Sequence, residues 1–261
     1  MDPAPFEFGW PSTRATLQRI ATHVLAQARQ HHDQLFDLRP CPGGFATHPV
    51  GPDRERLRLA GDSLIIERVT GPDVYTAEAT TIVVPTLGAT IKDLCESSGF
   101  SPSPDFWVGS DTPDLGEPEE ALVYDPVALA ELGDWYLLGQ RAIDIVTAEL
   151  ARKGDPGASV GRLWPEHFDY GIDLDPTAGS IPDAPRCNLG VAAGDAYHEM
   201  PDLYVGPWEV EWEVGSGPGE PEYWNATFGA IVDIVDVARS DDPLDAAVTF
   251  FTSGMDYLRQ G

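Results

Sequence analysis

Basic residues are scarce in this chain. Sixteen Lys and Arg residues face 43 Asp and Glu residues, which gives a formal charge of -27. A field of that sign repels phosphate backbones and anionic lipids. The nearest basic stripe, Arg54, Arg56 and Arg58, is interrupted by Glu55 and is typical of the outward side of a strand. We therefore expect no nucleic acid and no anionic membrane surface among the partners.

Cysteine is also rare, and long apolar runs are absent. Cys41, Cys95 and Cys187 are far apart and odd in number, and no CxxC pair accompanies them. The chain starts MDPAPFEFGWPSTR, without the basic and apolar regions of an export signal, and no window approaches the roughly 18 apolar residues of a spanning helix. These features predict reduced thiols in a cytoplasmic protein that neither spans nor enters a membrane.

The common signatures of cofactor and nucleophile chemistry are missing. Gly43 and Gly44 are not followed by the Lys, Ser or Thr of a phosphate loop, and no GxSxG elbow occurs. Cys41, in RPCPGGF, fits a turn better than a reactive thiolate. The sequence therefore identifies no cofactor.

The first hundred residues predict a helix, a set of strands and a second helix. Ser12 or Thr13 can cap a helix through TRATLQRIATHVLAQARQHH, and strands follow with a turn at Ala60-Gly61-Asp62. The second helix is expected from Leu87 to Ser97, with Gly99 as its left-handed end. One face of the first helix is apolar and is expected to be buried: Leu17, Ile20, Val24, Leu25 and Ala28.

The same order recurs after residues 101–120, which are rich in Pro, Gly, Ser and acid and predict a connection. Asp125 and Pro126 begin a long helix, three strand segments follow, and Asp241-Asp242-Pro243 begins a last helix. The sequence thus predicts an α+β fold with mainly antiparallel sheets in two similar helix-strands-helix halves, 1–100 and 121–261. Internal duplication and chance recurrence of a common order both explain the similarity.

The richest stretch for chemistry runs from Trp164 to Asn225. If LWPEHFDYG is one strand, alternation places His167 and Asp169 on the same face, about 7 Å apart. An imidazole and a carboxylate at that spacing can share a metal, or act as a base with its orienting partner. His198, in the loop before a later strand, can complete a 2-His-1-carboxylate set. The alternative is a histidine satisfied within the sheet and another in solvent.

Aromatic residues surround these groups and can line a pocket. A sugar would suit such walls, but carboxylates beside aromatic rings are expected by chance in so acidic a chain. The residues expected to contact a ligand are Trp164, Tyr204, Trp208, Trp224 and Asn225.

The segments TRATLQRIATHVLAQAR, RPCPGGFATHPVG, LWPEHFDYGIDL, GDAYHEMPDLYVGPW and YWNATFGA resemble a group of uncharacterised actinobacterial proteins of similar length. The resemblance covers nearly the whole chain. More remotely, the order of elements resembles a broader bacterial family of unknown function. These resemblances imply a stand-alone intracellular domain and supply no activity.

Three functions follow as hypotheses. We expect binding of a small neutral or cationic molecule by the C-terminal half, because an anion meets a repulsive field. An enzyme would use His167 as a base oriented by Asp169, with His198 as an acid or a metal ligand. An interaction module would instead present its tryptophans to a protein partner. Self-association into a homo-oligomer is left open.

Overall fold

The computed structural model describes residues 2–71, 78–181, 185–208 and 213–260. They form two compact units, which we describe separately. The first-sheet unit comprises Ala4–Asp134 and Leu163–Phe168, and the second-sheet unit comprises Met1–Pro3, Trp135–Arg162 and Asp169–Gly261. The boundary between the two units therefore falls inside the helix Pro126–Ala151. The expected connection at 101–120 belongs to the first-sheet unit.

The first-sheet unit opens with a short 3-10 helix and then a long helix in three sections. The long helix begins at Trp10 rather than at Ser12, because Gly9 enters the left-handed region at φ 74° and Pro11 falls in the first turn. The predicted apolar face is buried, with every member at most 2% exposed. The 3-10 helix is η1 Ala4–Phe6, and the three sections of the long helix are α1 Trp10–Ile20, the π-helical η2 Ala21–Ala26 and α2 Gln27–Asp33.

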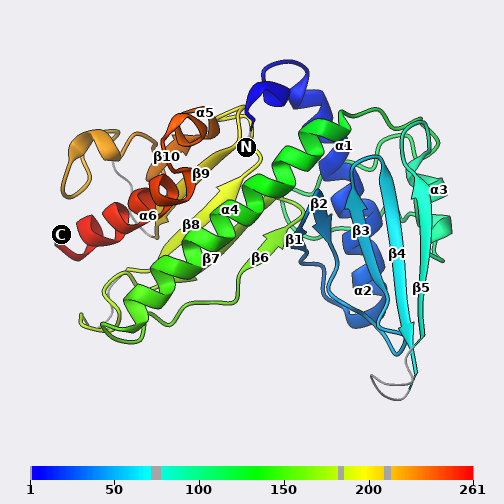
Figure 1. The fold of residues 1–261 in the computed structure, drawn as a ribbon, viewed down its shortest axis with the longest axis horizontal. Coiled ribbons are helices and arrows are strands. Elements are labelled where there is room, and N and C mark those ends of the chain that lie inside the picture. The colour runs from blue at the N-terminus through cyan, green and yellow to red at the C-terminus, as the bar shows by residue number, and fades with distance from the viewer. Residues whose placement is uncertain (1, 72–77, 182–184, 209–212, 261) are drawn as a thin grey trace. The chain divides into compact units, whose positions relative to one another are not determined.

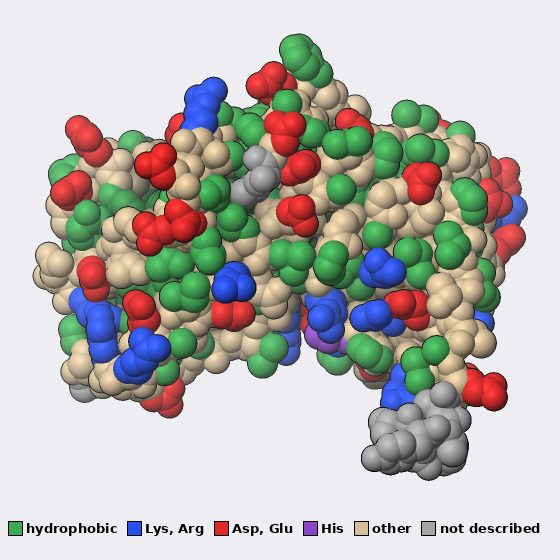
Figure 2. Space-filling view, viewed as in Figure 1, with side chains coloured by type: hydrophobic (Ala, Val, Ile, Leu, Met, Phe, Trp, Pro, Cys, Tyr) green, Lys and Arg blue, Asp and Glu red, His purple; other side chains and the backbone are tan. Residues whose placement is uncertain are grey.

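Five strands form an antiparallel sheet in chain order, with β5 at one edge (Figure 1). Leu57 and Leu59 of β3 point into the core, whereas Arg56 and Arg58 point outward. In Figure 2, Lys and Arg side chains gather over the region of β3 and β4. The strands are β1 Arg39–Cys41, β2 Gly44–Ala46, β3 Arg56–Ala60, β4 Ser63–Thr70 and β5 Glu78–Pro85.

A short helix, α3 Ile91–Ser97, follows the first sheet. It begins later than predicted, because Thr90 and Asp93 form a capping box that fixes the first turn. Gly99 has φ 87°, which confirms the predicted left-handed residue after the helix.

The long helix α4 Pro126–Ala151 confirms the predicted start, since Asp125 Oδ1 accepts from Val127 N at 2.8 Å. Its apolar spacing predicts one buried side, formed by Leu129, Leu132, Tyr136, Leu137, Ile143, Val146 and Leu150. Of these residues, only Leu137 is half-buried, and the others are buried. The next strands are β6 Arg162–Trp164, β7 Asp169–Leu174, β8 Cys187–Ala192, β9 Asp202–Pro207 and β10 Ala230–Asp233. The remaining elements are η3 Pro221–Tyr223, α5 Ile234–Arg239 and α6 Pro243–Gln260.

The second sheet is also antiparallel, in the order β10-β9-β8-β7-β6. Helices and two five-stranded antiparallel sheets together confirm the α+β class. Duplication stays a prediction. Within the described part of the chain, no helix is both long enough and apolar enough to cross a membrane.

Candidate functional site

The second sheet has one face covered by helices of its own unit. A Cβ added at Gly139 of α4 would lie 2.0 Å from Val191, and one at Gly254 of α6 would lie 3.2 Å from Val205. Strand register places both valines on the same face, so α4 and α6 pack on that side. This apolar face is the core of the unit.

The opposite face, which we call the polar face, has a different composition. It carries aspartates, glycines and a tyrosine, because most of the side chains that alternate with the core residues are polar or absent. By register, its members are Asp169, Gly171, Asp173, Asn188, Gly190, Ala192, Asp202, Tyr204, Gly206, Ile231 and Asp233.

Three aspartates occupy one row at the end of this face. Asp169 pairs with Ala192, Ala192 with Asp202, and Asp202 with Asp233. Neighbouring strands lie about 4.8 Å apart, so Asp202 and Asp233 are direct neighbours and Asp169 lies two strands from Asp202. The row therefore concentrates negative charge at one end of the sheet.

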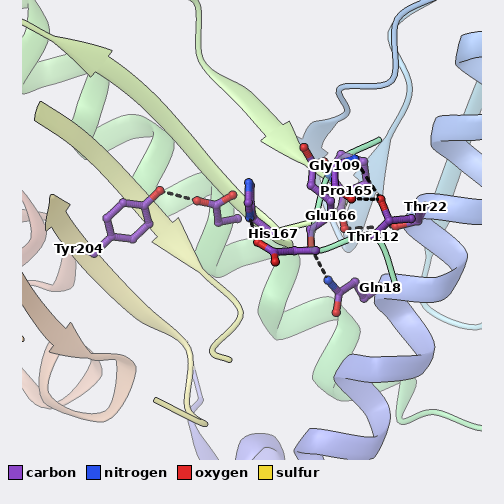
Figure 3. Close-up of polar contacts among 10 residues, drawn as sticks. Gln18, Thr22, Gly109, Thr112, Pro165, Glu166, His167 and Tyr204 are labelled. Carbon is purple, nitrogen blue, oxygen red and sulfur yellow. Dashed lines mark hydrogen bonds and ion pairs between the residues drawn. The ribbon is translucent and has the colours of Figure 1, made fainter. Parts of the chain in front are cut away.

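Tyr204 lies across the sheet next to this row. A Cβ added at Gly190 would lie 2.1 Å from the Tyr204 ring, and one at Gly171 would lie 3.2 Å from its hydroxyl. The Tyr204 ring therefore packs on these two glycines, which have no side chain in its way. Its hydroxyl donates to Asp169 Oδ2, as Figure 3 shows. Burial, followed by the charge of Asp169, raises the pKa of Tyr204 well above its usual value, so the hydroxyl keeps its proton.

Asp202 has the most perturbed carboxyl group of the row. Only 5% of the residue is exposed. Burial, together with the charges of Asp195, Asp233 and Asp169, raises its pKa to about 8. None of these influences favours the carboxylate, so Asp202 is largely protonated at neutral pH.

His198 is held beside the row by the loop between β8 and β9. Asp195 Oδ1 accepts from Tyr197 N at 2.7 Å and from His198 N at 2.9 Å. The His198 ring then places Nε2 3.1 Å from Asp233 Oδ2. Asp233 also caps α5 through Val235 N. A histidine-aspartate pair therefore exists, but its aspartate is Asp233 and not Asp169.

The prediction of one continuous strand through LWPEHFDYG is wrong. A turn at residues 165–168 separates β6 from β7, and Phe168 N donates to Trp164 O at 2.8 Å. Pro165 has no N–H to give to a ladder. Carbonyl groups of this turn instead accept from the first helix, from Gln18 at Glu166 O and Thr22 at Pro165 O (Figure 3).

His167 lies in this turn, as part of the first-sheet unit. Its Nδ1 is 3.0 Å from Asp111 Oδ2, and both side chains are more than half exposed. His167 is therefore not on the strand face that carries Asp169, and the predicted alternation is wrong. The described residues contain no group of three His, Cys, Asp or Glu side chains arranged to hold a metal ion, so His167, Asp169 and His198 do not form one.

The predicted aromatic residues are divided between several surroundings. Trp224 is fully buried and donates to Pro218 O at 2.6 Å, so it belongs to the core. Asn225 exchanges two hydrogen bonds with the backbone of Ile231. Trp164, in the first-sheet unit, packs against Phe36 with the ring centres 5.8 Å apart.

Trp208 extends the polar face beyond the end of β9. It is 42% exposed, and its Nε1 donates to Asn188 Oδ1 at 2.9 Å. The Arg186 guanidinium lies 5.8 Å from the centre of its ring. Of the predicted ligand-binding residues, Tyr204 and Trp208 are therefore the two on this face.

Asp202, Asp233 and Gly190 are the residues that sequence reasoning missed. The signal for Asp202 was present, because alternation in MPDLYVGP puts it on the same face as Tyr204. Asp233 and Gly190 join the site only through strand pairing, which no local pattern reveals.

A shallow groove of about 530 Å³ lies elsewhere in the second-sheet unit. Its polar groups already serve the fold: the Tyr223 hydroxyl donates to Phe250 O at 2.8 Å, and Asp242 accepts from Leu244 N at the start of α6. It is therefore a weaker candidate than the polar face. Its lining is Tyr223, Ser240, Asp241, Asp242, Asp245, Ala246, Thr249, Phe250 and Ser253.

No protein-family model matches the chain, and no curated protein or solved structure is significantly similar to it.

Proposed function

We propose that the C-terminal half binds a small organic cation, such as a primary amine or a guanidinium, on the polar face beside the aspartate row. The observation that carries the proposal is Asp202, a buried carboxyl group whose neighbours in the row are also acidic. A bound cation would supply the missing counter-charge. This narrows the sequence expectation of a neutral or cationic ligand to a cationic one.

The electrostatics of the row support a cation over an anion or a neutral ligand. A bound cation would offset the negative charges around Asp202. It would therefore favour the Asp202 carboxylate and lower the pKa of this group. Binding at pH 7 would then release up to one proton per ligand. The affinity would rise with pH until Asp202 is ionised in the free protein, near pH 8.

The shape of the site favours an organic cation over a bare metal ion. A metal site needs several ligands that converge on one point, and the described residues supply no such group. An ammonium or guanidinium group needs only a few acceptors and can also rest on an aromatic face. Tyr204, half-buried beside the row, is the aromatic residue nearest to it on the polar face.

The test is calorimetry with agmatine, putrescine and spermidine at pH 7, in two buffers that differ in protonation enthalpy. We expect one of these amines to bind with proton release. Asp202→Asn should remove the proton release and weaken binding about tenfold, because a charge-assisted bond is lost. Tyr204→Phe should weaken binding to a smaller extent.

Asp173→Asn is the matched control, because Asp173 lies on the same face and strand as Asp169 but pairs with Arg186. It should leave the affinity unchanged. Absence of binding by all three amines at millimolar concentration would contradict the proposal. Equal losses in Asp173→Asn and Asp202→Asn would also contradict it, since general surface charge would then explain the binding.

An acid-base enzyme is the second candidate, and the raised pKa of Asp202 is the observation that favours it. A carboxyl group that is neutral at pH 7 can donate a proton, as a general acid must. The His198-Asp233 pair lies next to it in the row. For any substrate found, the rate should fall as pH rises through about 8, and Asp202→Asn should abolish that limb of the profile.

The third hypothesis, a protein partner held by exposed tryptophans, has less support. Among the described tryptophans, Trp107 and Trp208 are exposed, and they belong to different units. Each ring by itself is a small anchor for a stable partner.

We also infer a cytoplasmic location. All three cysteines are free and buried, and burial raises the pKa of the Cys41 thiol to about 11 and of Cys95 to about 12. Unreactive, unpaired thiols are typical of a reducing compartment. Alkylation of the denatured protein, taken directly from cells, should label three thiols.

A further inference from the structure

Strand β5 differs from the other strands of the first sheet in its exposure. Seven of its eight residues are exposed, whereas β4 beside it alternates buried and half-buried positions over its first half. Ile82 is 45% exposed and Val83 is 58% exposed, although the two side chains point to opposite faces. Both faces of β5 are therefore open, and both carry an apolar side chain.

The outer edge of β5 is open as well. It is the last strand of its sheet in the described part of the chain (Figure 1). Its eight residues pair with eight of β4 without a break, from Glu78 with Thr70 to Pro85 with Ser63. Backbone groups on the side away from β4 are then free to pair with another strand.

Protective features that proteins place on such edges are few here. Between Glu78 and Pro85 there is no charge, no proline and no bulge. The five residues Thr80 to Val84 are all β-branched, which favours strand pairing. A long, regular and uncharged edge of this composition is typical of a strand that pairs with another chain.

We propose that β5 pairs with β5 of a second copy of this chain, which joins the two first sheets into one antiparallel sheet of ten strands. Charge is the first argument for this occupant. Residues 39–85 contain five arginines and six acidic residues, so they carry one negative charge of the total of -27. This stretch is therefore nearly neutral, so pairing two copies through it brings little net charge together.

Symmetry is the second argument. Antiparallel pairing about a twofold axis at Ile82 sets each Ile82 opposite the partner's Ile82 and each Thr81 opposite the partner's Val83, which are favourable pairs of β-branched side chains. Each Glu78 then lies opposite the partner's Thr86. The two Glu78 side chains are separated by eight residue steps, roughly 27 Å. The only charge on the strand therefore does not oppose its own copy.

The size of the contact sets the expected strength. One added strand buries less surface than a standard stable interface, so the dimer should dissociate reversibly at micromolar concentrations. Sedimentation velocity of the full-length protein from about 1 to 200 µM, at 0.15 M salt, should show a monomer-dimer equilibrium.

Val83→Lys should shift the protein to monomer over this range, because it places two like charges at the paired edge. Val127→Lys is the matched control: Val127 lies in the first turn of α4 and is also 58% exposed. It should leave the equilibrium unchanged. Both variants should keep the wild-type circular dichroism spectrum, since neither side chain is buried.

Hydrogen exchange gives a readout that does not depend on the variants. Amides of β5 in the wild-type protein should exchange more slowly at 200 µM than at 1 µM, while those of β3 should not change. A wild-type protein that stays monomeric throughout would overturn the proposal. A dimer that survives Val83→Lys without added protection in β5 would overturn it too.

Discussion

The pKa of Asp202 depends on both its burial and its charged neighbours. Its pKa rises from an ordinary 3.8 to about 8, first because it is buried and then because three other aspartates lie near it. The folded state therefore favours the protonated form. This contribution to stability is fully present below pH 3.8 and is lost as the pH rises toward 8.

The pH dependence of unfolding tests this account. Relative to Asp202→Asn, the free energy of unfolding of the wild type should fall by roughly 1.4 kcal/mol per pH unit between about pH 4 and pH 8. Urea unfolding at pH 5, 6, 7 and 8 measures the slope. Asp134→Asn, on the exposed side of α4, removes one charge and should keep the wild-type slope. Identical slopes in all three proteins would rule out a perturbed Asp202.

The residues of the site were only partly accessible from sequence. Tyr204 and Trp208 were predicted to contact a ligand, and both lie on the polar face. Trp224 was predicted with them but is fully buried, because an indole that packs in a core has the same sequence context as one that lines a pocket. His198 was predicted to act with Asp169, and it pairs with Asp233.

At the scale of elements, Gly190 of β8 and Gly206 of β9 differ in the space available for an added methyl group. A methyl group at Gly190 would overlap the Tyr204 ring at 2.1 Å, whereas at Gly206 its nearest neighbour is Phe228 O at 3.8 Å. Both glycines lie on the polar face. Gly190→Ala should therefore cost about 1–3 kcal/mol and disturb the bond from Tyr204 to Asp169.

Gly206→Ala should be close to neutral, because the added methyl group has room. Guanidinium unfolding compares the two variants, and near-ultraviolet circular dichroism follows the tyrosine environment. Equal stabilities would mean that the Tyr204 ring can move aside at no cost.

Helix α3 tests the role of capping in a short element. Thr90 Oγ1 accepts from Asp93 N at 3.0 Å, and Asp93 Oδ2 accepts from Thr90 N at 3.0 Å. Thr90→Ala should reduce the free energy of unfolding by about 1 kcal/mol. Ser97→Ala, later in the same helix, removes only a bond to Asp93 O and should cost less. A larger effect at Ser97 than at Thr90 would contradict this view of the helix.

Elements with local end signals were predicted well. Asp125 with Pro126 and Asp242 with Pro243 mark helix starts that the structure confirms. The segment from Trp164 to Gly171 was predicted as one strand and contains a turn instead. Its alternating pattern was compatible with a strand, but contacts from Gln18 and Thr22, far away in sequence, stabilise the turn.

Charge is the dominant property at the scale of the whole molecule. A formal charge of -27 on 261 residues makes the compact state repel itself. Raising NaCl from 0.02 to 0.3 M at pH 7 should therefore raise the melting temperature, by on the order of 5 °C, because salt screens this repulsion. Differential scanning calorimetry measures the shift.

The increment should shrink at pH 5, closer to the isoelectric point of about 4.2, since fewer carboxylates are ionised there. A melting temperature that is unchanged or lowered by salt at pH 7 would show that self-repulsion is not a significant term in the stability of this protein.

The sequence by itself determined the α+β class, the helix starts marked by Asp and Pro, the outward side of the strand that carries Arg56 and Arg58, and the strongly acidic net charge. These depend on composition and on periods of a few residues, which are present in the chain before it folds. Only the tertiary structure decided which strands pair, and so brought Asp169, Asp202 and Asp233 into one row. It also paired His167 with Asp111. Pairing joins residues that are distant in sequence, and its energy comes from the packed sheet and not from any local pattern.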